Sequence, residues 1–470
     1  MSEDLLFIVA GREKSLAQFT AAFARRLPEE LRLVAWTSPT SFREPEIDNC
    51  WHPKFIAEGT AIFFLREVPK MFRAVLAGAR RFVLGRFGAV KFFPSEQSTI
   101  IGITPATICT IEGERVKTAY CHPEDAARIS WIVFEDRGNA RDTFASRWRA
   151  LKNLCVLLLA WAKTSFPRAL TQPDVAVAAV LTLRWMLHLH WACLLALGGR
   201  VEALLLNDKK PSLVFGVHEL WPWSRVVWDI CKRAGVSTIT FQHASITRSK
   251  LWYFPHAEEL AAGMALPDTF VVFSQKEREL LAPHFPATTR FLFGCGPRYA
   301  HWKEIIVGPT QTLADQAVLF VSSVPWWDNE VVLEAAVRLL ELGARRPVIV
   351  RVHPLAVVPG KWRRWLECAR AHGEIFRPAE SLAEDLARCS AVVGMNSTVL
   401  EEAAMLGKGV VVLEQDHFLS FAPQLGTHVT TQEFSWESVE RALLQMSGQT
   451  AAFARHGLGL DLPVYRLTRR

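Results

Sequence analysis

The chain has 470 residues, more than one ordinary hydrophobic core accommodates, so we expect two or three domains. Hydrophobic residues make up 50% of it, which is ample for globular cores, and its nine cysteines form no CxxC pair, which argues against a zinc or disulfide framework. The 54 basic and 47 acidic residues give a net charge of +7, which fits work near anionic lipids or acidic glycans and would fit nucleic acid too.

The amino terminus predicts a cytoplasmic protein that opens with a βαβ unit. The apolar run Leu5–Ala10 is too short for a signal peptide, and unpatterned cysteines favour reduced thiols. We read Leu5–Ala10 and Leu31–Trp36 as two strands separated by a helix. The amino-terminal half is therefore expected to contain its own Rossmann-like sheet.

Two segments of this half raise the question of a membrane. Basic and apolar residues alternate over residues 66–91, and Val68–Leu84 can be drawn as a basic amphipathic helix on an anionic membrane surface. The alternative is a solvated face of a packed helix. Val175–Leu197 is long enough to span a bilayer, but Arg184 and two histidines interrupt it, so we expect a buried or interfacial helix.

Two predicted strands, 211–217 and 236–241, each end in polar residues. Glu219 follows the first and is our candidate catalytic carboxylate, because a carboxylate facing a cleft can take the proton of a hydroxyl or act as a nucleophile. The alternative is a helix-start acid. His243 follows the second strand and could stabilise developing charge, or be a buried hydrogen-bonded histidine. Gln242 and Trp221 are candidates for lining a ligand cleft, although core packing also suits Trp221.

The carboxyl-terminal half has a strand–loop–helix pattern with polar strand ends. Residues 315–323 begin a second sheet, and Ser322 at the end of this strand is expected to face the ligand. The strand 348–350 leads into Arg351-Val352-His353-Pro354, and the strand 391–393 into Asn396-Ser397-Thr398. In open α/β sheets, ligands bind at this carboxyl edge.

The segment after Asn396 has the features of a phosphate site. Ser397 and Thr398 begin a predicted helix, whose free N–H groups and hydroxyls suit a phosphate. Glu401 and Glu402 lie one turn further, where they could accept hydrogen bonds from ribose hydroxyls. The alternative is a plain N-cap followed by first-turn acids.

These motifs resemble the donor half of GT-B glycosyltransferases. Arg351-Val352-His353-Pro354 followed by Asn396-Ser397-Thr398-Val399-Leu400-Glu401-Glu402-Ala403 is similar to the group that assembles bacterial surface polysaccharides. That group includes sialyltransferases, capsule Kdo transferases and CDP-glycerol glycerophosphotransferases. The resemblance covers roughly residues 205–445.

The resemblance implies roles for particular residues. It implies that the His353-Pro354 and Ser397-Thr398 pairs hold the phosphate and sugar of a CMP- or CDP-linked donor, with Arg351 where the family often has Lys. The turn Gly296-Pro297-Arg298 is similar to one at the entrance of the donor domain, where Arg298 would reach the phosphates or form a salt bridge.

We therefore predict an α/β protein of the GT-B type, with two Rossmann-like domains facing each other across a cleft. The predicted divisions are an acceptor domain (1–300), a donor domain (301–450) and a basic tail (451–470). The predicted activity is metal-independent glycosyl transfer, from a CMP-activated Kdo or sialic-like sugar to a surface polysaccharide or lipid-linked glycan. No metal or cofactor is expected, because the nucleotide-sugar is a substrate and no Asp-x-Asp pair occurs.

Expected partners are the donor, the glycan acceptor and an anionic membrane surface at the inner face of the plasma membrane, with no nucleic acid. Three alternatives stay open: a CDP-glycerol-type phosphotransferase, a UDP-sugar 2-epimerase, and a non-catalytic assembly or export partner.

Overall fold

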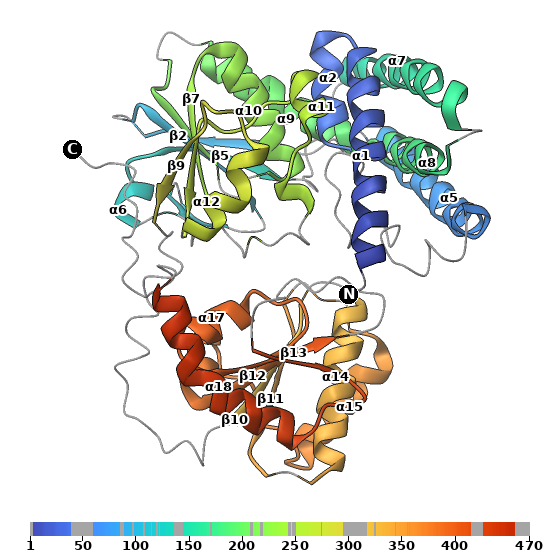
Figure 1. The fold of residues 1–470 in the computed structure, drawn as a ribbon. Helices are drawn as coiled ribbons and strands as arrows, with labels where there is room; N and C mark the ends of the chain where they lie inside the picture. Colours follow the sequence, from blue (N-terminus) through green and yellow to red (C-terminus); the bar gives the residue numbers. More distant parts are fainter. Residues whose placement is uncertain are drawn as a thin grey trace.

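The chain folds into two lobes, each with a sheet between helices (Figure 1). The computed structural model describes residues 3–38, 60–84, 89–95, 98–106, 109–113, 115–118, 121, 123–135, 144–169, 172–206, 210–216, 220–242, 246, 251–273, 275–294, 317–323, 326–343, 345–354, 356, 358–414 and 426–455.

The amino-terminal lobe is built on a seven-stranded sheet of order β1-β5-β2-β6-β7-β8-β9. Neighbouring strands run parallel, except that β1 is antiparallel to β5. Beside it lies the hairpin β3–β4. The strands are β1 (Ala89–Phe93), β2 (Ile100–Pro105), β3 (Cys109–Glu112), β4 (Arg115–Thr118), β5 (Ser130–Glu135), β6 (Leu213–Gly216), β7 (Ser237–Phe241), β8 (Thr269–Val272) and β9 (Arg290–Phe293).

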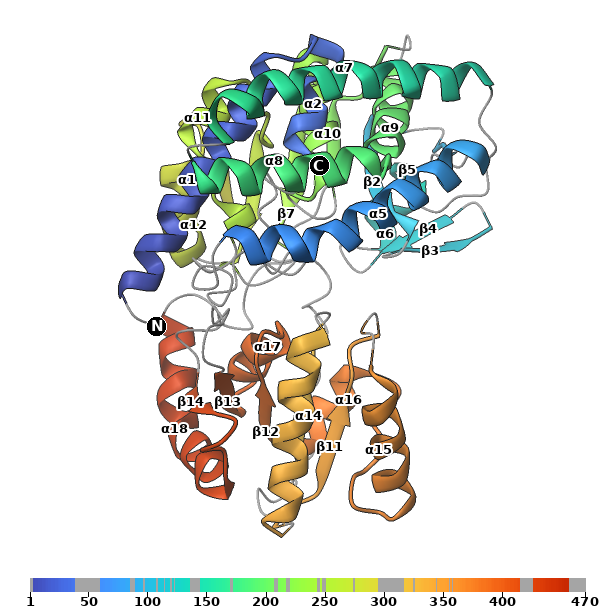
Figure 2. The same cartoon turned by 90° about the vertical axis from the view of Figure 1, so that its right-hand side faces the viewer.

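Helices pack on this sheet and extend well beyond it. Three long helices, α5, α8 and α7, lie side by side at the outer edge of the lobe, with α8 in the middle (Figure 2). The helices of this lobe are α1 (Glu3–Arg25), α2 (Glu29–Trp36), α5 (Thr60–Leu84), α6 (Pro123–Ala126), α7 (Phe144–Ala169), α8 (Pro173–Leu187), α9 (His190–Leu205), α10 (Pro222–Ala234), α11 (Ala257–Ala261) and α12 (Gln275–Leu281), with 3-10 turns η2 (Leu251–Tyr253) and η3 (Ala282–His284).

Among the described helices, none is by itself long and apolar enough to cross a membrane. The pair α8 and α9 passes that test jointly, with a bend of 67° between the two helices. Both contribute many side chains to the core of the lobe, as a buried or interfacial helix would.

The predicted βαβ opening is wrong. Residues Leu5–Ala10 belong to helix α1, and Leu31–Trp36 belong to helix α2. The helix that we expected between the two strands extends back through the first apolar run. Pro28 precedes α2, and Glu29 and Glu30 occupy its first turn, where acids are favoured by the helix dipole. Both helices pack into the core as additions to the sheet.

The carboxyl-terminal lobe contains a five-stranded, fully parallel sheet of order β11-β10-β12-β13-β14. The strands are β10 (Ala317–Val321), β11 (Val348–Arg351), β12 (Cys389–Gly394), β13 (Gly409–Glu414) and β14 (Thr427–Thr430). The helices are α14 (Trp326–Glu341), α15 (Gly360–Ala371), α16 (Leu382–Arg388), α17 (Val399–Met405) and α18 (Trp436–Arg455).

Both faces of this sheet are covered, which explains why its strands read as continuous apolar runs. Val318 and Phe320 of β10 point into a core that α14, α15 and α18 complete. Leu319 and Val321 point to the opposite face, where α16 and α17 cover the sheet. This is a doubly wound α/β domain.

The predicted pair of Rossmann-like domains is confirmed by the two sheets. They span residues 89–293 and 317–430. The predicted boundary at residue 300 lies outside the described residues. Helix α18 continues to Arg455, so the predicted tail begins within a helix, and residues 456–470 also lie outside the described part.

Candidate functional site

The carboxyl-terminal sheet has its topological switch point at β10. The chain passes from β10 through α14 to β11 on one side, and β12 then pairs with the other side of β10. Loops leaving β10 and β12 therefore diverge, and in doubly wound folds the resulting crevice is where ligands bind. Helix α17, which follows β12, lies at the end of its lobe that is nearer to the amino-terminal lobe (Figures 1 and 2).

A buried carboxylate, Asp328 in the first turn of α14, connects the two loops at this switch point. Its Oδ2 accepts a hydrogen bond of 2.7 Å from the Ser323 hydroxyl after β10, and one of 3.1 Å from the Asn396 N–H after β12. Its Oδ1 is buried and has no hydrogen-bond partner among the described residues. Burial raises the pKa of Asp328 to about 6, although both hydrogen bonds act in the opposite direction.

The loop after β11 is joined to the same edge by Ser322. The Ser322 hydroxyl accepts a hydrogen bond of 2.9 Å from the His353 N–H, and the Ser322 N–H donates to the Arg351 carbonyl at 3.2 Å. Ser322 is buried and His353 is half-buried. The ends of β10, β11 and β12 are thus held together by polar contacts, with the predicted residues Ser322 and His353 among them.

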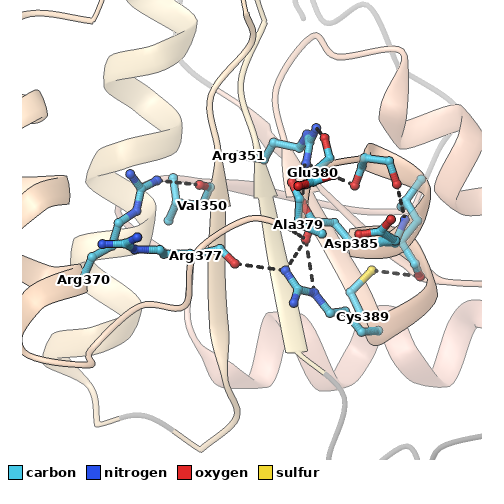
Figure 3. Close-up of polar contacts among 12 residues, drawn as sticks. Val350, Arg351, Arg370, Arg377, Ala379, Glu380, Asp385 and Cys389 are labelled. Atoms are coloured by element: carbon cyan, nitrogen blue, oxygen red, sulfur yellow. Dashed lines mark hydrogen bonds and ion pairs between the residues drawn. The ribbon is translucent and has the colours of Figure 1, made fainter.

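The Arg351 side chain makes structural contacts within the carboxyl-terminal lobe. Its guanidinium forms an ion pair of 2.6 Å with Asp385, which is fully buried, and donates to the carbonyls of Ala379, Glu380 and Ser381 (Figure 3). Asp385 in turn accepts from the Ala379 N–H at 2.9 Å and from Arg388. The sequence suggested that Arg351 contacts phosphate, and the structure shows it holding the segment before α16.

A pocket of about 390 Å³ lies beside Pro354, which is exposed on the loop after β11. Arg363 and Arg370 of α15 line it together with one acid, Glu367. Burial and the nearby charge of Arg377 lower the pKa of Arg370. The excess of positive charge makes this pocket suited to an anionic group.

The Ser397-Thr398 pair begins α17 as predicted, but the helix has only seven residues. The Ser397 hydroxyl accepts from the Val399 N–H at 3.3 Å, while the N-cap residue of the helix is Thr398, whose side chain makes no capping hydrogen bond. Ser397 and Thr398 are both half-buried. Glu401 is half-buried and Glu402 is buried, so Glu401 is the better placed of the two to meet a ribose.

Gly394 allows the close approach of β12 to β10 just before this loop. A Cβ atom at Gly394 would lie 2.9 Å from the Val321 carbonyl oxygen and 3.3 Å from a methyl group of Leu400. Real Cβ atoms hardly ever come so close to a backbone oxygen. Glycine is therefore required where β12 approaches the backbone of β10 at the switch point.

Candidate residues of the amino-terminal lobe are only partly described. The Gln242 side chain is buried and accepts from the Phe273 N–H at 2.9 Å, which joins the ends of β7 and β8. Trp221 precedes α10 and packs against the core, in agreement with the core-packing alternative. Glu219, His243 and Arg298 lie outside the described residues.

Sequence reasoning missed Asp328. It noted Ser322 after β10, but an acid in the first turn of a helix is common and carries no distinctive signal. The distinguishing feature is the contact with Asn396, which is 68 residues away in the chain.

Comparisons with known proteins give only distant likenesses. No protein-family model and no curated protein matches the sequence. The chain is similar to the UDP-GlcNAc 2-epimerase from Neisseria meningitidis bound to UDP-GlcNAc, at 12% identity and a TM-score of 0.38, covering 58% of this chain and 77% of that chain. It is also similar to the wall teichoic acid polymerase TagF, at 13% identity and a TM-score of 0.33, covering 58% and 71%. The glycosyltransferase of kitacinnamycin aligns at 14% identity and a TM-score of 0.35, covering 57% and 79%. At these values, the likenesses assign no activity to this chain.

Proposed function

We propose that this chain is a nucleotide-sugar-dependent glycosyltransferase whose donor binds at the carboxyl edge of β10, β11 and β12. The observation that carries the proposal is the polar cluster at the switch point, where Ser322 contacts the His353 backbone and Asp328 joins Ser323 to Asn396. Switch points of doubly wound sheets bind nucleotides in many unrelated proteins. The acceptor would bind the amino-terminal lobe, which contains its own Rossmann-like sheet.

The chemistry follows from the charge that develops during transfer. As the bond between the anomeric carbon and the phosphate oxygen of the donor breaks, the leaving nucleotide phosphate gains negative charge, which the His353 ring and the hydroxyls of Ser397 and Thr398 would stabilise. Glu401 would accept hydrogen bonds from the ribose. Glu219 would take the proton of the acceptor hydroxyl as that oxygen attacks the anomeric carbon. Arg351 acts as a positioning residue, because its guanidinium is held by Asp385.

The donor we propose is a CMP-activated Kdo or sialic-like acid, and the acceptor a surface polysaccharide or lipid-linked glycan. This finer assignment rests on the resemblance of Arg351–Pro354 and Asn396–Ala403 to the donor motifs of the polysaccharide-assembling transferases. The arginine-lined pocket beside Pro354 is compatible with an acidic sugar, since three arginines and one acid line it. No metal or cofactor is part of the proposed reaction.

A donor panel tests this proposal and separates the alternatives. The full chain is incubated with CMP-sialic acid, CMP-Kdo, CDP-glycerol or UDP-GlcNAc, with and without a lipid-linked glycan, and the nucleotides and sugars are separated by chromatography. Acceptor-dependent release of CMP from a CMP-sugar, lost in Glu219→Gln, is the expected result. Release of CMP from CDP-glycerol indicates the phosphotransferase instead, and conversion of UDP-GlcNAc without an acceptor indicates the epimerase. No turnover of any donor contradicts the enzyme and favours the assembly partner.

A further inference from the structure

Helix α5 carries an apolar stripe on its solvent face. Residues at helical spacing along it remain at least 39% exposed, including Phe72 at 65% and Leu76 at 53%. Such a continuous row differs from the scattered exposed leucines of ordinary surfaces and marks an interaction site. The exposed apolar residues of α5 are Leu65, Val68, Phe72, Val75, Leu76, Val83 and Leu84.

Helix α7 carries a second stripe, which the sequence did not suggest. Trp148 and Phe166, near its two ends, are 62% and 68% exposed, and Leu151 and Leu159 lie between them. The spacings of three, eight and seven residues place these four side chains along one side of the helix. A large aromatic residue at each end extends the stripe over most of the helix.

The two stripes belong to one packed layer. Helices α5 and α7 contact α8 from its two sides, and the three run side by side across one face of the lobe (Figure 2). Glu67 of α5 is buried in an ion pair of 2.5 Å with Arg184 of α8. The Arg147 guanidinium of α7 donates to the Val83 carbonyl of α5 at 3.1 Å. These contacts hold α5 and α7 in place relative to α8 and to each other.

The charges on these helices are of one sign. The sequence of α7 contains no Asp or Glu, and the one acid of α5, Glu67, is buried and paired with Arg184 and Lys70. The exposed charged residues of these two helices are therefore all basic. The described basic residues are Lys70, Arg73, Arg80 and Arg81 on α5, and Arg147, Arg149, Lys152 and Lys163 on α7.

We propose that α5 and α7 form a docking face that binds the surface of an anionic lipid bilayer, with the helices lying on the membrane. Apolar residues flanked by cations are the arrangement by which amphipathic helices enter the headgroup region. Each cation near an anionic surface adds to the attraction, and the absence of exposed acid from both helices matches that charge. This inference goes beyond the proposed activity and does not depend on it.

Vesicle co-sedimentation of the full chain tests the proposal. The protein is mixed with phosphatidylcholine vesicles, with or without phosphatidylglycerol, and the bound fraction is measured over a range of salt. We expect binding to the anionic vesicles that weakens as salt rises. The double variant Phe72→Glu/Leu76→Glu should bind at least about tenfold more weakly. Removing two charges in Arg73→Gln/Arg80→Gln should weaken binding by about 25-fold, at about fivefold for each.

A matched control is Leu444→Glu on α18 of the other lobe, where the leucine is 82% exposed. It introduces one carboxylate, against two in Phe72→Glu/Leu76→Glu, at a position far from α5 and α7 in the chain, and should bind like the wild type. Circular dichroism and melting temperature verify that each variant is folded. Failure of the wild type to bind anionic vesicles overturns the proposal, as does equal loss in the control. Self-association that Phe72→Glu/Leu76→Glu abolishes, without vesicle binding, would assign the face to a second copy of the chain.

Discussion

Replacing Asp328 with Asn tests the description of the switch point by its effect on stability. Asn can keep an oxygen where Oδ2 accepts from Ser323 and Asn396, and it removes the ionisable group. The substitution therefore separates the geometry of the cluster from the energy of its buried charge. It puts a carboxamide NH₂ in the position of the Oδ1 atom that has no partner among the described residues.

The magnitude follows from the pKa of Asp328, which burial raises from 3.8 to about 6. At about 1.4 kcal/mol for each pKa unit, ionising this carboxyl costs the folded state about 3 kcal/mol relative to the unfolded chain. The folded state holds the proton more tightly. The contribution of Asp328 to the free energy of unfolding is therefore highest below about pH 4 and is lost as pH rises through about 6. The Asp328→Asn variant would have no such dependence.

The assay is urea unfolding followed by tryptophan fluorescence, on wild type and Asp328→Asn, at about pH 4.5 and about pH 7.5. Between the lower and the higher pH, the free energy of unfolding of the variant should rise by about 2 kcal/mol relative to that of the wild type. This is less than the full contribution of Asp328, because the wild type has already lost part of that contribution at the lower pH. Glu330→Gln, two residues along α14 and half-exposed, controls for loss of a charge on this helix. A difference between Asp328→Asn and wild type that is the same at both pH values would refute the reasoning.

Three further substitutions test contacts within each lobe. Each is measured as a change in the free energy of unfolding in urea. Asp385→Ala should destabilise the carboxyl-terminal lobe by about 1–3 kcal/mol, because the half-buried Arg351 and the Ala379 N–H would lose the buried carboxylate that they contact; an unchanged stability would show that these contacts are dispensable. Gly394→Ala should cost about 1–3 kcal/mol by forcing a Cβ against the Val321 carbonyl, and an unchanged stability would contradict the close approach. Arg225→Ala should cost at least about 3 kcal/mol, because the buried guanidinium donates to the carbonyls of Leu220, Trp36 and Trp252; a neutral effect would contradict these contacts.

The sheets were predictable because a fully buried parallel strand leaves a clear mark in the sequence. Strands β10, β12 and β13 are short β-branched runs bounded by polar or glycine residues, and both of their faces are covered by helices. The same rule failed at Leu5–Ala10. A short apolar run inside an amphipathic helix cannot be told from a strand by hydrophobicity alone.

The candidate site was predictable in position but not in detail. Polar residues after strands identified Ser322, His353 and Ser397, since the carboxyl ends of parallel strands meet at one edge. The commitment of Arg351 to Asp385, and the bridge from Asp328 to Asn396, depend on contacts between residues 34 and 68 positions apart. No local pattern encodes such contacts, so the structure was needed to distinguish a phosphate ligand from a positioning residue.

Nucleotide binding at the edge of β10, β11 and β12 is the central claim, and a thermal-shift panel tests it most directly. Wild type and His353→Ala are melted with CMP, CDP, UDP, GDP or ADP, because a ligand at about 100 times its Kd stabilises by about 2.7 kcal/mol. We predict a rise in melting temperature that is selective for the cytidine nucleotides and is lost in His353→Ala. No shift with any nucleotide, or an equal shift in the variant, would contradict a donor site at this edge.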